Sequence, residues 1–365
     1  MHIHCLCGAI DEEISEAGRE GGASVEICHC YGCRHSTGLL YSSYVSVNGE
    51  EANQVIQKNA LGSYREKFDP YGTTELHFCK TCGSQLFRAV RTGGKTVTGV
   101  ASGVIASIDG DEGLSFVSQA NAESTTDGGI SRWMSQIKKV EHKSQHFTQE
   151  TQPSSVSGVA ASCLCTAVKF RLTPPNDESS KPRSGFADSI IPFHTNDPEI
   201  KNPNDVKWWL RESNTKYAAS LCACKTCRLA SGFEIQSWAF VPRTNIEFRL
   251  DPDKAWSALN FDTLRERGIV QTFDSSAGVQ REFCSRCGAT LFWHDKWRPD
   301  LIDVSVGLIH SEKGALAEDL LDWVLQRISF AEDAPIGRSG SVAATAVEFV
   351  NHLEQSMKIS SEIDA

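Results

Sequence analysis

Fourteen cysteines dominate the chemistry available to this sequence, and they form the same three clusters twice. Each set contains a CxC pair, then a CxCxxC trio, then a CxxCG pair. The first set is Cys5 and Cys7, then Cys28, Cys30 and Cys33, then Cys79 and Cys82; the second is Cys163 and Cys165, then Cys222, Cys224 and Cys227, then Cys284 and Cys287. Because no cysteine is left over, we predict a tandem repeat built around metal-binding thiol clusters.

The two outer pairs of each set offer four thiols, which is the number that a tetrahedral zinc ion takes. The CxxCG pairs are typical of metal knuckles, in which a tight turn directs both sulfurs to one ion and the glycine tolerates a positive φ. The CxC pairs are the obvious donors of the other two ligands. A closed site of this kind has no free coordination position, so we predict a structural role. Iron remains an alternative to zinc. A redox pair is disfavoured, because residues 85–87 after the first knuckle resemble a strand and not a helix.

The trios are one ligand short of a tetrahedral set. A zinc ion with three protein ligands and one open position is typical of catalysis, because a thiol or water can take the fourth place and ionise there. His29 could be a fourth ligand, but its counterpart is Ala223, so a bystander role is favoured. Nearby cations could favour thiolates and attract an anion, or could be solvated loop residues; they are Arg34, Lys80, Lys225, Arg228 and Arg286.

The elements that must position these cysteines are predicted to be mainly β-strands. Strand-like segments run over residues 2–14, 25–28, 39–47 and 95–108. We predict a short helix over 205–216, which contains Trp208 and Trp209. A second helix is predicted at the C-terminus, with its apolar stripe packed on the second repeat or, alternatively, used in a dimer contact. That stripe consists of Val342, Ala346, Phe349, Val350, Leu353 and Met357.

A length of 365 residues suits two domains. We expect a first domain over 1–137, a polar linker over 138–158 and a second domain over 159–365 that includes the C-terminal helix. The second domain carries an insertion at about 174–220, which could form a lid or a plain surface loop.

Composition excludes several classes of protein. With 40% hydrophobic and 22% charged residues the chain can form a core in each half. Its net charge of −10 argues against a nucleic-acid partner, which would require a basic surface. No apolar run approaches the roughly 18 residues of a membrane span, and no secretory signal is visible. We therefore expect a cytoplasmic protein with reduced thiols, no membrane association and an oligomeric state that the sequence leaves open.

The order CxC, CxCxxCRxxxG and FCxxCGxxLF resembles the glutathione-dependent formaldehyde-activating enzyme family, which also includes centromere protein V. The motifs extend over roughly residues 2–125 and 160–335. The resemblance implies two tandem β-tent domains, each stapled by zinc (Zn²⁺). It implies a structural zinc on the four outer cysteines of each repeat and a more labile, activity-linked zinc on each trio. That makes two ions per repeat and up to four per chain.

The resemblance further implies a carbon–sulfur lyase that uses glutathione as cosubstrate and a small-molecule thiol adduct as partner. The model reaction joins glutathione and formaldehyde into S-hydroxymethylglutathione. Thr166, in place of the glycine after the first pair, and the insertion depart from the family pattern. A larger adduct is therefore an alternative substrate. A non-catalytic zinc scaffold or protein-interaction module, and a metal or thiol buffer, are alternative functions. The trio is intact in both repeats, which favours an enzyme.

Overall fold

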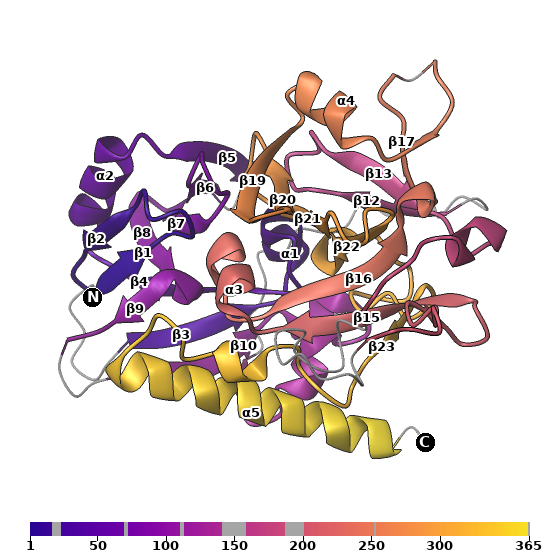
Figure 1. Ribbon diagram of the computed structural model, residues 1–365. Helices are drawn as coiled ribbons and strands as arrows, with labels where there is room; N and C mark the ends of the chain where they lie inside the picture. The colour runs from indigo at the N-terminus through magenta and orange to yellow at the C-terminus, as the bar shows by residue number, and fades with distance from the viewer. Residues whose placement is uncertain are drawn as a thin grey trace.

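Two large β-sheets, one from each repeat, form the centre of the molecule (Figure 1). The computed structural model describes residues 1–16, 23–68, 72–109, 113–140, 158–186, 201–251 and 253–363. The first sheet has the order β11-β10-β3-β4-β8-β7-β6-β5. Its strands are β3 (Ala23–Cys28), β4 (Ser42–Ser46), β5 (Gly62–Phe68), β6 (Gly72–Phe78), β7 (Gln85–Thr92), β8 (Lys95–Ala101), β10 (Leu114–Ala120) and β11 (Lys138–Val140).

The second sheet repeats this topology. Its order is β14-β15-β16-β22-β21-β20-β19, with β23 paired to β15. The strands are β14 (Leu210–Arg211), β15 (Lys216–Cys222), β16 (Gln236–Pro242), β19 (Val270–Ser276), β20 (Val279–Cys284), β21 (Thr290–Asp295), β22 (Leu301–Ser305) and β23 (Leu321–Trp323). In both sheets a later strand lies parallel to the strand that ends at the trio: β10 beside β3, and β23 beside β15. This shared topology agrees with the prediction of a tandem repeat.

Each repeat also has a small sheet that carries its CxC pair. The first contains β1 (His2–His4), β2 (Asp11–Glu13) and β9 (Ile105–Ser107), and the second contains β12 (Val159–Ser162), β13 (Lys169–Leu172), β17 (Ile246–Phe248) and β18 (Ser257–Ala258). The prediction of one strand over 2–14 is wrong, because β1 and β2 form a hairpin and the pair occupies its turn. A turn, and not strand alternation, therefore directs these two thiols.

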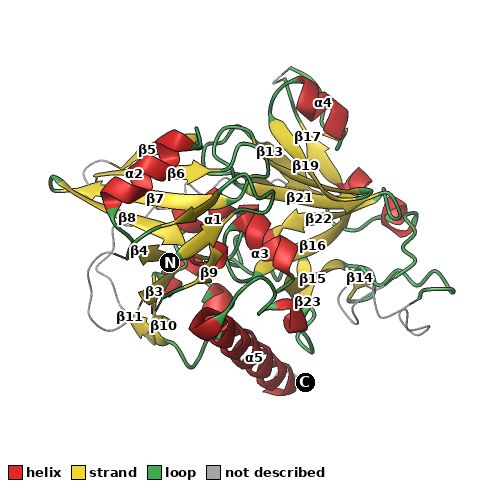
Figure 2. Cartoon of the chain, turned by 60° about the vertical axis from the view of Figure 1, so that its left-hand side comes forward, coloured by secondary structure: helices red, strands yellow, loops and turns green. Residues whose placement is uncertain are grey.

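Short helices accompany the sheets (Figure 2). They are α1 (Tyr31–Thr37), α2 (Gly49–Lys58), α3 (Lys225–Ser231) and α4 (Phe261–Glu266). None of them was predicted from the sequence, because each is too short to show a clear apolar stripe; α2, the longest of the four, buries only Ala52 and Val55. The mainly β prediction is confirmed as a mostly β structure with a C-terminal helix.

The helix predicted over 205–216 is not formed. In this segment β14 lies between turns at 208–209 and 212–215, and β15 begins at Lys216. The Asn202 side chain accepts a hydrogen bond from the backbone of Val206 at 2.8 Å and donates one back to its carbonyl, and Asp205 and Glu212 have positive φ. Side-chain bonds to the local backbone compete with helix formation in this way. Residues 187–200 of the insertion lie outside the described residues.

The helices that follow the two trios cross between the repeats. Helix α1 contacts η8 (Val306–Leu308) of the second repeat, and α3 contacts η1 (Ser102–Val104) of the first. The Gly307 amide donates to the Gly38 carbonyl at 3.0 Å, and the Gly103 amide donates to the Gly232 carbonyl at 2.8 Å. Both views place α1 and α3 at the junction of the two halves (Figure 1, Figure 2). Each trio is therefore built at the contact between repeats.

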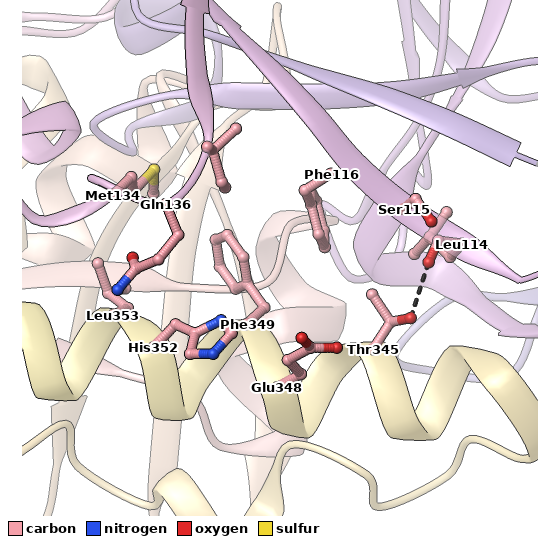
Figure 3. Close-up of a pocket in the computed structure, with 11 residues that line it drawn as sticks. Leu114, Ser115, Phe116, Met134, Gln136, Thr345, Glu348, Phe349, His352 and Leu353 are labelled. Carbon is pink, nitrogen blue, oxygen red and sulfur yellow. Dashed lines mark hydrogen bonds between the residues drawn. The ribbon is translucent and has the colours of Figure 1, made fainter.

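The C-terminal helix α5 (Gly340–Ile363) packs mainly on the first repeat, contrary to the expectation from its sequence. It covers β9, β10 and η3 (Gly129–Trp133) and also touches η9 (Ala331–Asp333) of the second repeat. Phe349 lies 4.5 Å from Phe116, centroid to centroid, and Thr345 donates to the Leu114 carbonyl at 2.7 Å (Figure 3). Among the described residues no helix, α5 included, is long and apolar enough to cross a membrane.

The start of the predicted linker belongs to the first sheet. Residues 138–140 form β11, which pairs in parallel with β10. Residues 141–157 lie outside the described residues, so the remainder of the linker stays a prediction.

Candidate metal centres

The thiols gather into four groups in which all sulfurs lie within 4.8 Å of one another. Two groups contain four cysteines and two contain three. The four-thiol groups are Cys5, Cys7, Cys79 and Cys82, and Cys163, Cys165, Cys284 and Cys287; the three-thiol groups are Cys28, Cys30 and Cys33, and Cys222, Cys224 and Cys227. These are the sets that the spacing grouped together, and each could hold a metal ion.

In each four-thiol group, the hairpin turn of the small sheet meets the turn that follows β6 or β20 of the large sheet. In the first, the Sγ atoms of Cys5 and Cys7 lie 3.5 Å apart, and that of Cys7 lies 3.7 Å from Cys79. Gly83 and Gly288 follow the knuckles with φ of +79° and +74°, which confirms the prediction of a positive φ after each CxxC pair. Each group therefore joins a small sheet to a large one.

The second repeat keeps the same turn without its first glycine. Gly8 has a φ of +74°, and Thr166 at the equivalent position has a φ of +56°. A β-branched residue in this left-handed region is strained. The departure from the family pattern thus changes the residue and preserves the backbone that presents Cys163 and Cys165.

Each trio spans the end of a strand and the start of a helix. Cys28 ends β3, Cys30 is the N-cap of α1, and Cys33 lies in its first turn. Cys222, Cys224 and Cys227 repeat this placement on β15 and α3. The strand end, the cap and the first turn bring the sulfurs together on one side of the backbone. Cys28, Cys33 and Cys224 are partly exposed as whole residues, whereas three of the four cysteines in the first closed group, and all four in the second, are buried.

One thiol in each trio is much more acidic than an ordinary cysteine. Hydrogen bonds from the other two thiols hold the pKa of Cys33 well below its usual value, and Arg88 lowers it further. In the second trio the same bonds hold the pKa of Cys227 well below its usual value, and Arg281 adds to the effect. A nearby cation favours a thiolate, which is the form that binds metal.

These two arginines lie directly beside the trios. Arg88 Nη1 is 3.8 Å from Cys33 Sγ, and its guanidinium stacks 4.2 Å from the Tyr44 ring centroid. Arg281 Nη2 is 3.5 Å from Cys227 Sγ. Neither arginine was identified from the sequence, because both lie far from the trios along the chain. Their position on strands next to the knuckles is the only local signal that could have indicated them.

The cations near the cysteines in sequence have other roles. Arg34 and Arg228 are buried and are not solvated loop residues. Arg34 donates to the His29 carbonyl at 3.3 Å, and Arg228 donates to the Ile336 carbonyl at 2.8 Å and to that of Gly103. They fix the backbone around the trio helices. Lys80 and Arg286 are exposed and Lys225 is half-buried.

His29 lies apart from the group formed by the first trio, which agrees with the bystander interpretation. Its side chain is fully buried, and Nε2 lies 3.1 Å from Oε1 of Gln119. Burial lowers the pKa of His29 to about 4, so the ring is neutral at pH 7.

The trios differ in their surroundings. Asn121 donates to Cys28 Sγ at 3.2 Å in the first repeat, so its trio has a polar neighbour. The second trio belongs to an apolar cluster, with buried Trp209, Ala218, Trp238, Phe240 and Leu301, and with partly buried Trp208, Leu210, Trp293 and Phe330.

A separate pocket lies between α5 and β10, away from the thiols (Figure 3). Its lining includes Phe116, Met134, Phe349, His352 and Leu353. No cysteine lines this pocket, so it is separate from the thiol groups.

Comparison with known families assigns the repeats. The profile of the family described as glutathione-dependent formaldehyde-activating enzyme matches residues 1–116 and 205–325. The second match begins after Cys163 and Cys165, yet these thiols lie beside Cys284 and Cys287, as their first-repeat counterparts do. No curated protein and no solved structure was found to match the chain.

Proposed function

Because the chain belongs to the glutathione-dependent formaldehyde-activating enzyme family, we propose that it is a zinc-dependent carbon–sulfur lyase acting on glutathione adducts. The substrate is of the S-hydroxymethylglutathione type or a larger adduct. One observation carries the proposal: each repeat holds a three-thiol group that includes a partly exposed cysteine and lies beside a guanidinium. A pure scaffold would need only the closed four-thiol groups.

The residues present suit zinc. Four cysteines whose sulfurs lie within 4.8 Å of one another form the ligand set of a closed structural site. We propose that zinc in these groups staples each small sheet to its large sheet, as in a β-tent. The trios offer three thiols and leave one position for a ligand from solution. Bound there, zinc would supply a Lewis acid that favours the thiolate form of a sulfur ligand.

The chain's own residues supply charge and orientation. Cys28, Cys30 and Cys33 would hold the ion in the first repeat, and Arg88 balances their negative charge. In the second repeat Cys222, Cys224 and Cys227 have the same role, with Arg281 beside them. In the forward reaction a bond forms between the glutathione sulfur and the aldehyde carbon, and the thiol proton ends on the aldehyde oxygen. We propose a small-molecule adduct as the partner, and neither nucleic acid nor membrane.

Metal content tests the proposal. We expect about four zinc ions per chain, falling to about two in the double variant Cys30→Ser with Cys224→Ser, because only the trios lose a ligand. Turnover of S-hydroxymethylglutathione should disappear in that variant while circular dichroism keeps the wild-type spectrum. If the wild-type protein, fully loaded with zinc, shows no turnover of any glutathione adduct, the lyase proposal is wrong.

A further inference from the structure

In each repeat, the arginine beside the trio belongs to a pair of residues that face each other on adjacent strands. The two pairs are equivalent, but the arginine lies on the later strand in the first repeat and on the earlier strand in the second. In the first repeat Leu76 on β6 faces Arg88 on β7. In the second repeat Arg281 on β20 faces Trp293 on β21. Leu76 and Arg281 both lie two residues before the phenylalanine of the knuckle motif, so the pairs are equivalent. The exchange keeps one cation at each trio and replaces a leucine partner by a tryptophan at the second.

A second pair of equivalent positions is also aromatic in the second repeat and not in the first. The amide that follows the first trio cysteine donates to Ala120 at 3.0 Å in one repeat and to Ser329 at 2.9 Å in the other. The next residues, Asn121 and Phe330, both have left-handed backbones, with φ of 62° and 56°. Asparagine tolerates this conformation and phenylalanine is strained in it. The second repeat thus has an aromatic ring where the first has an amide that donates to a trio thiol.

A third pair lies on the strand next to the trio. Tyr44 on β4 and Trp238 on β16 stand at equivalent register, two residues after the partners of Cys28 and Cys222. The insertion adds Trp208, whose ring lies 4.8 Å from that of Phe240. The third pair is aromatic in both repeats, and it is Trp208, Trp293 and Phe330 that make the second trio more aromatic than the first.

This aromatic cluster is more than a packed core. Trp208, Trp293, Phe330 and Cys224 all belong to one cluster and are all partly exposed, so aromatic side chains and a trio residue lie together at its edge. Arg281 is only 4% exposed, and its Nε and Nη1 have no hydrogen-bond partner among the residues that the structure describes. A buried cation with free donors requires an acceptor, because an unsatisfied polar group in the interior is costly.

We infer that the two trios serve different substrates: the second takes an anionic thiol adduct with a flat apolar substituent, and the first takes a small polar adduct. This inference rests on the proposed function for the choice of glutathione as the thiol. Arg281 attracts the anionic portion through its buried positive charge, and Trp293, Phe330 and Trp208 contact the substituent. Phe330 is the residue that we assign to specificity most directly, because its equivalent in the first repeat is the polar residue Asn121.

Binding of two thioether probes tests this assignment on the zinc-loaded full chain. S-(4-nitrobenzyl)glutathione carries a flat apolar group that quenches tryptophan fluorescence, and S-methylglutathione carries only a methyl group. We expect the nitrobenzyl probe to bind at least roughly tenfold more tightly, by calorimetry, and to quench the fluorescence of the second trio's tryptophans.

The variant Phe330→Asn should weaken nitrobenzyl binding roughly tenfold and change S-methyl binding less than about twofold. This substitution suits the left-handed backbone, so the variant is expected to fold. Trp293→Leu provides a second test at an independent position. The reciprocal variant Asn121→Phe should raise the affinity of the first trio for the nitrobenzyl probe.

Equal affinity for the two probes, equal weakening of both by Phe330→Asn, or binding of neither would overturn the inference. These results are separable from a failure of the lyase proposal. Turnover of S-hydroxymethylglutathione without any aryl preference would uphold the lyase and reject the aromatic site. Aryl-selective binding without turnover of any adduct would do the reverse.

Discussion

Arg281 shows how one side chain can change the charge balance of a cluster of three cysteines. Its side chain is buried and donates to Cys227 Sγ and, at 3.2 Å, to Thr226 Oγ1. A guanidinium stays charged at every accessible pH, so it offsets a thiolate permanently. Because metal binding requires the deprotonated thiol, a neighbouring cation would indirectly stabilise a trio that holds a metal ion.

We therefore expect Arg281→Gln to weaken zinc binding at the second trio by roughly 10- to 100-fold, as is usual when a residue that supports a metal ligand is lost. Competition with a chromophoric chelator would measure this. Arg286→Gln is the matched control, because that arginine lies one residue from Cys287 but is exposed. Equal zinc affinity in Arg281→Gln and wild type would show that Arg281 does not tune the trio.

At the scale of elements, the trio helices end against the other repeat. Gly232, the C-cap of α3, has a φ of +88°, and a Cβ there would lie 2.4 Å from the Gln85 carbonyl oxygen. Gly38 caps α1 in the same way against the carbonyl of Thr290. The glycines satisfy two demands at once, a left-handed backbone and a close approach between repeats. Larger residues would push the trio helices away from the junction.

Gly232→Ala should therefore destabilise the protein by about 3 kcal/mol, as the sum of left-handed strain and a steric clash. Gly268→Ala separates the two causes, because Gly268 has a φ of +65° and a Cβ there would meet no described atom within 4 Å; we expect a loss of about 1 kcal/mol there. Urea unfolding with zinc present would measure both. Similar losses in the two variants would mean that the contact between repeats contributes little.

At the scale of the whole molecule, a histidine pair joins the repeats. His35 from α1 contacts the Ser162 carbonyl at 2.7 Å, and His310 of the second repeat contacts the Ser162 hydroxyl at 2.8 Å. The two rings stack with centroids 4.5 Å apart, and Tyr31 stacks on His35. Burial of both rings means that the junction is built for neutral imidazoles.

This junction predicts a loss of stability in acid. Burial lowers the pKa of His310 to about 4, and the charges of Arg34 and Lys169 contribute. Burial also lowers the pKa of His35, which faces it. Between pH 7 and pH 5 the unfolded chain takes up a proton on His310 and the folded chain does not. The free energy of unfolding therefore decreases as the pH is lowered. The loss from His310 alone is about 2 kcal/mol.

The variant His310→Gln should lose this part of the pH dependence, because glutamine keeps a polar contact and does not titrate. The quantity to compare is the change in free energy of unfolding from pH 7 to pH 5 in the variant and the wild type. Protonation of thiols affects both proteins and cancels in the comparison. If the free energy of unfolding changes by the same amount from pH 7 to pH 5 in His310→Gln and in the wild type, His310 is not the source of the pH dependence.

The sequence by itself determined the composition of the thiol groups and the repeat. Two cysteines separated by two residues in a tight turn can direct both sulfurs to one place, so Cys79 and Cys82 form a unit from local geometry alone. The repeated order of clusters likewise requires two similar halves. Strand propensity was sufficient for a mostly β structure, whereas short helices such as α1 left too weak a pattern to be predicted.

Only the tertiary structure decided what surrounds those groups. Arg88 and Arg281 reach the trios from opposite strands of equivalent hairpins, and register of this kind depends on pairing across the sheet and not on neighbours in sequence. The position of α5 on the first repeat and the crossing of α1 and α3 between repeats depend on which apolar faces remain uncovered once both sheets have formed. Long-range packing settles such contacts, so the local pattern that groups the thiols carries no information about the side chains that surround them.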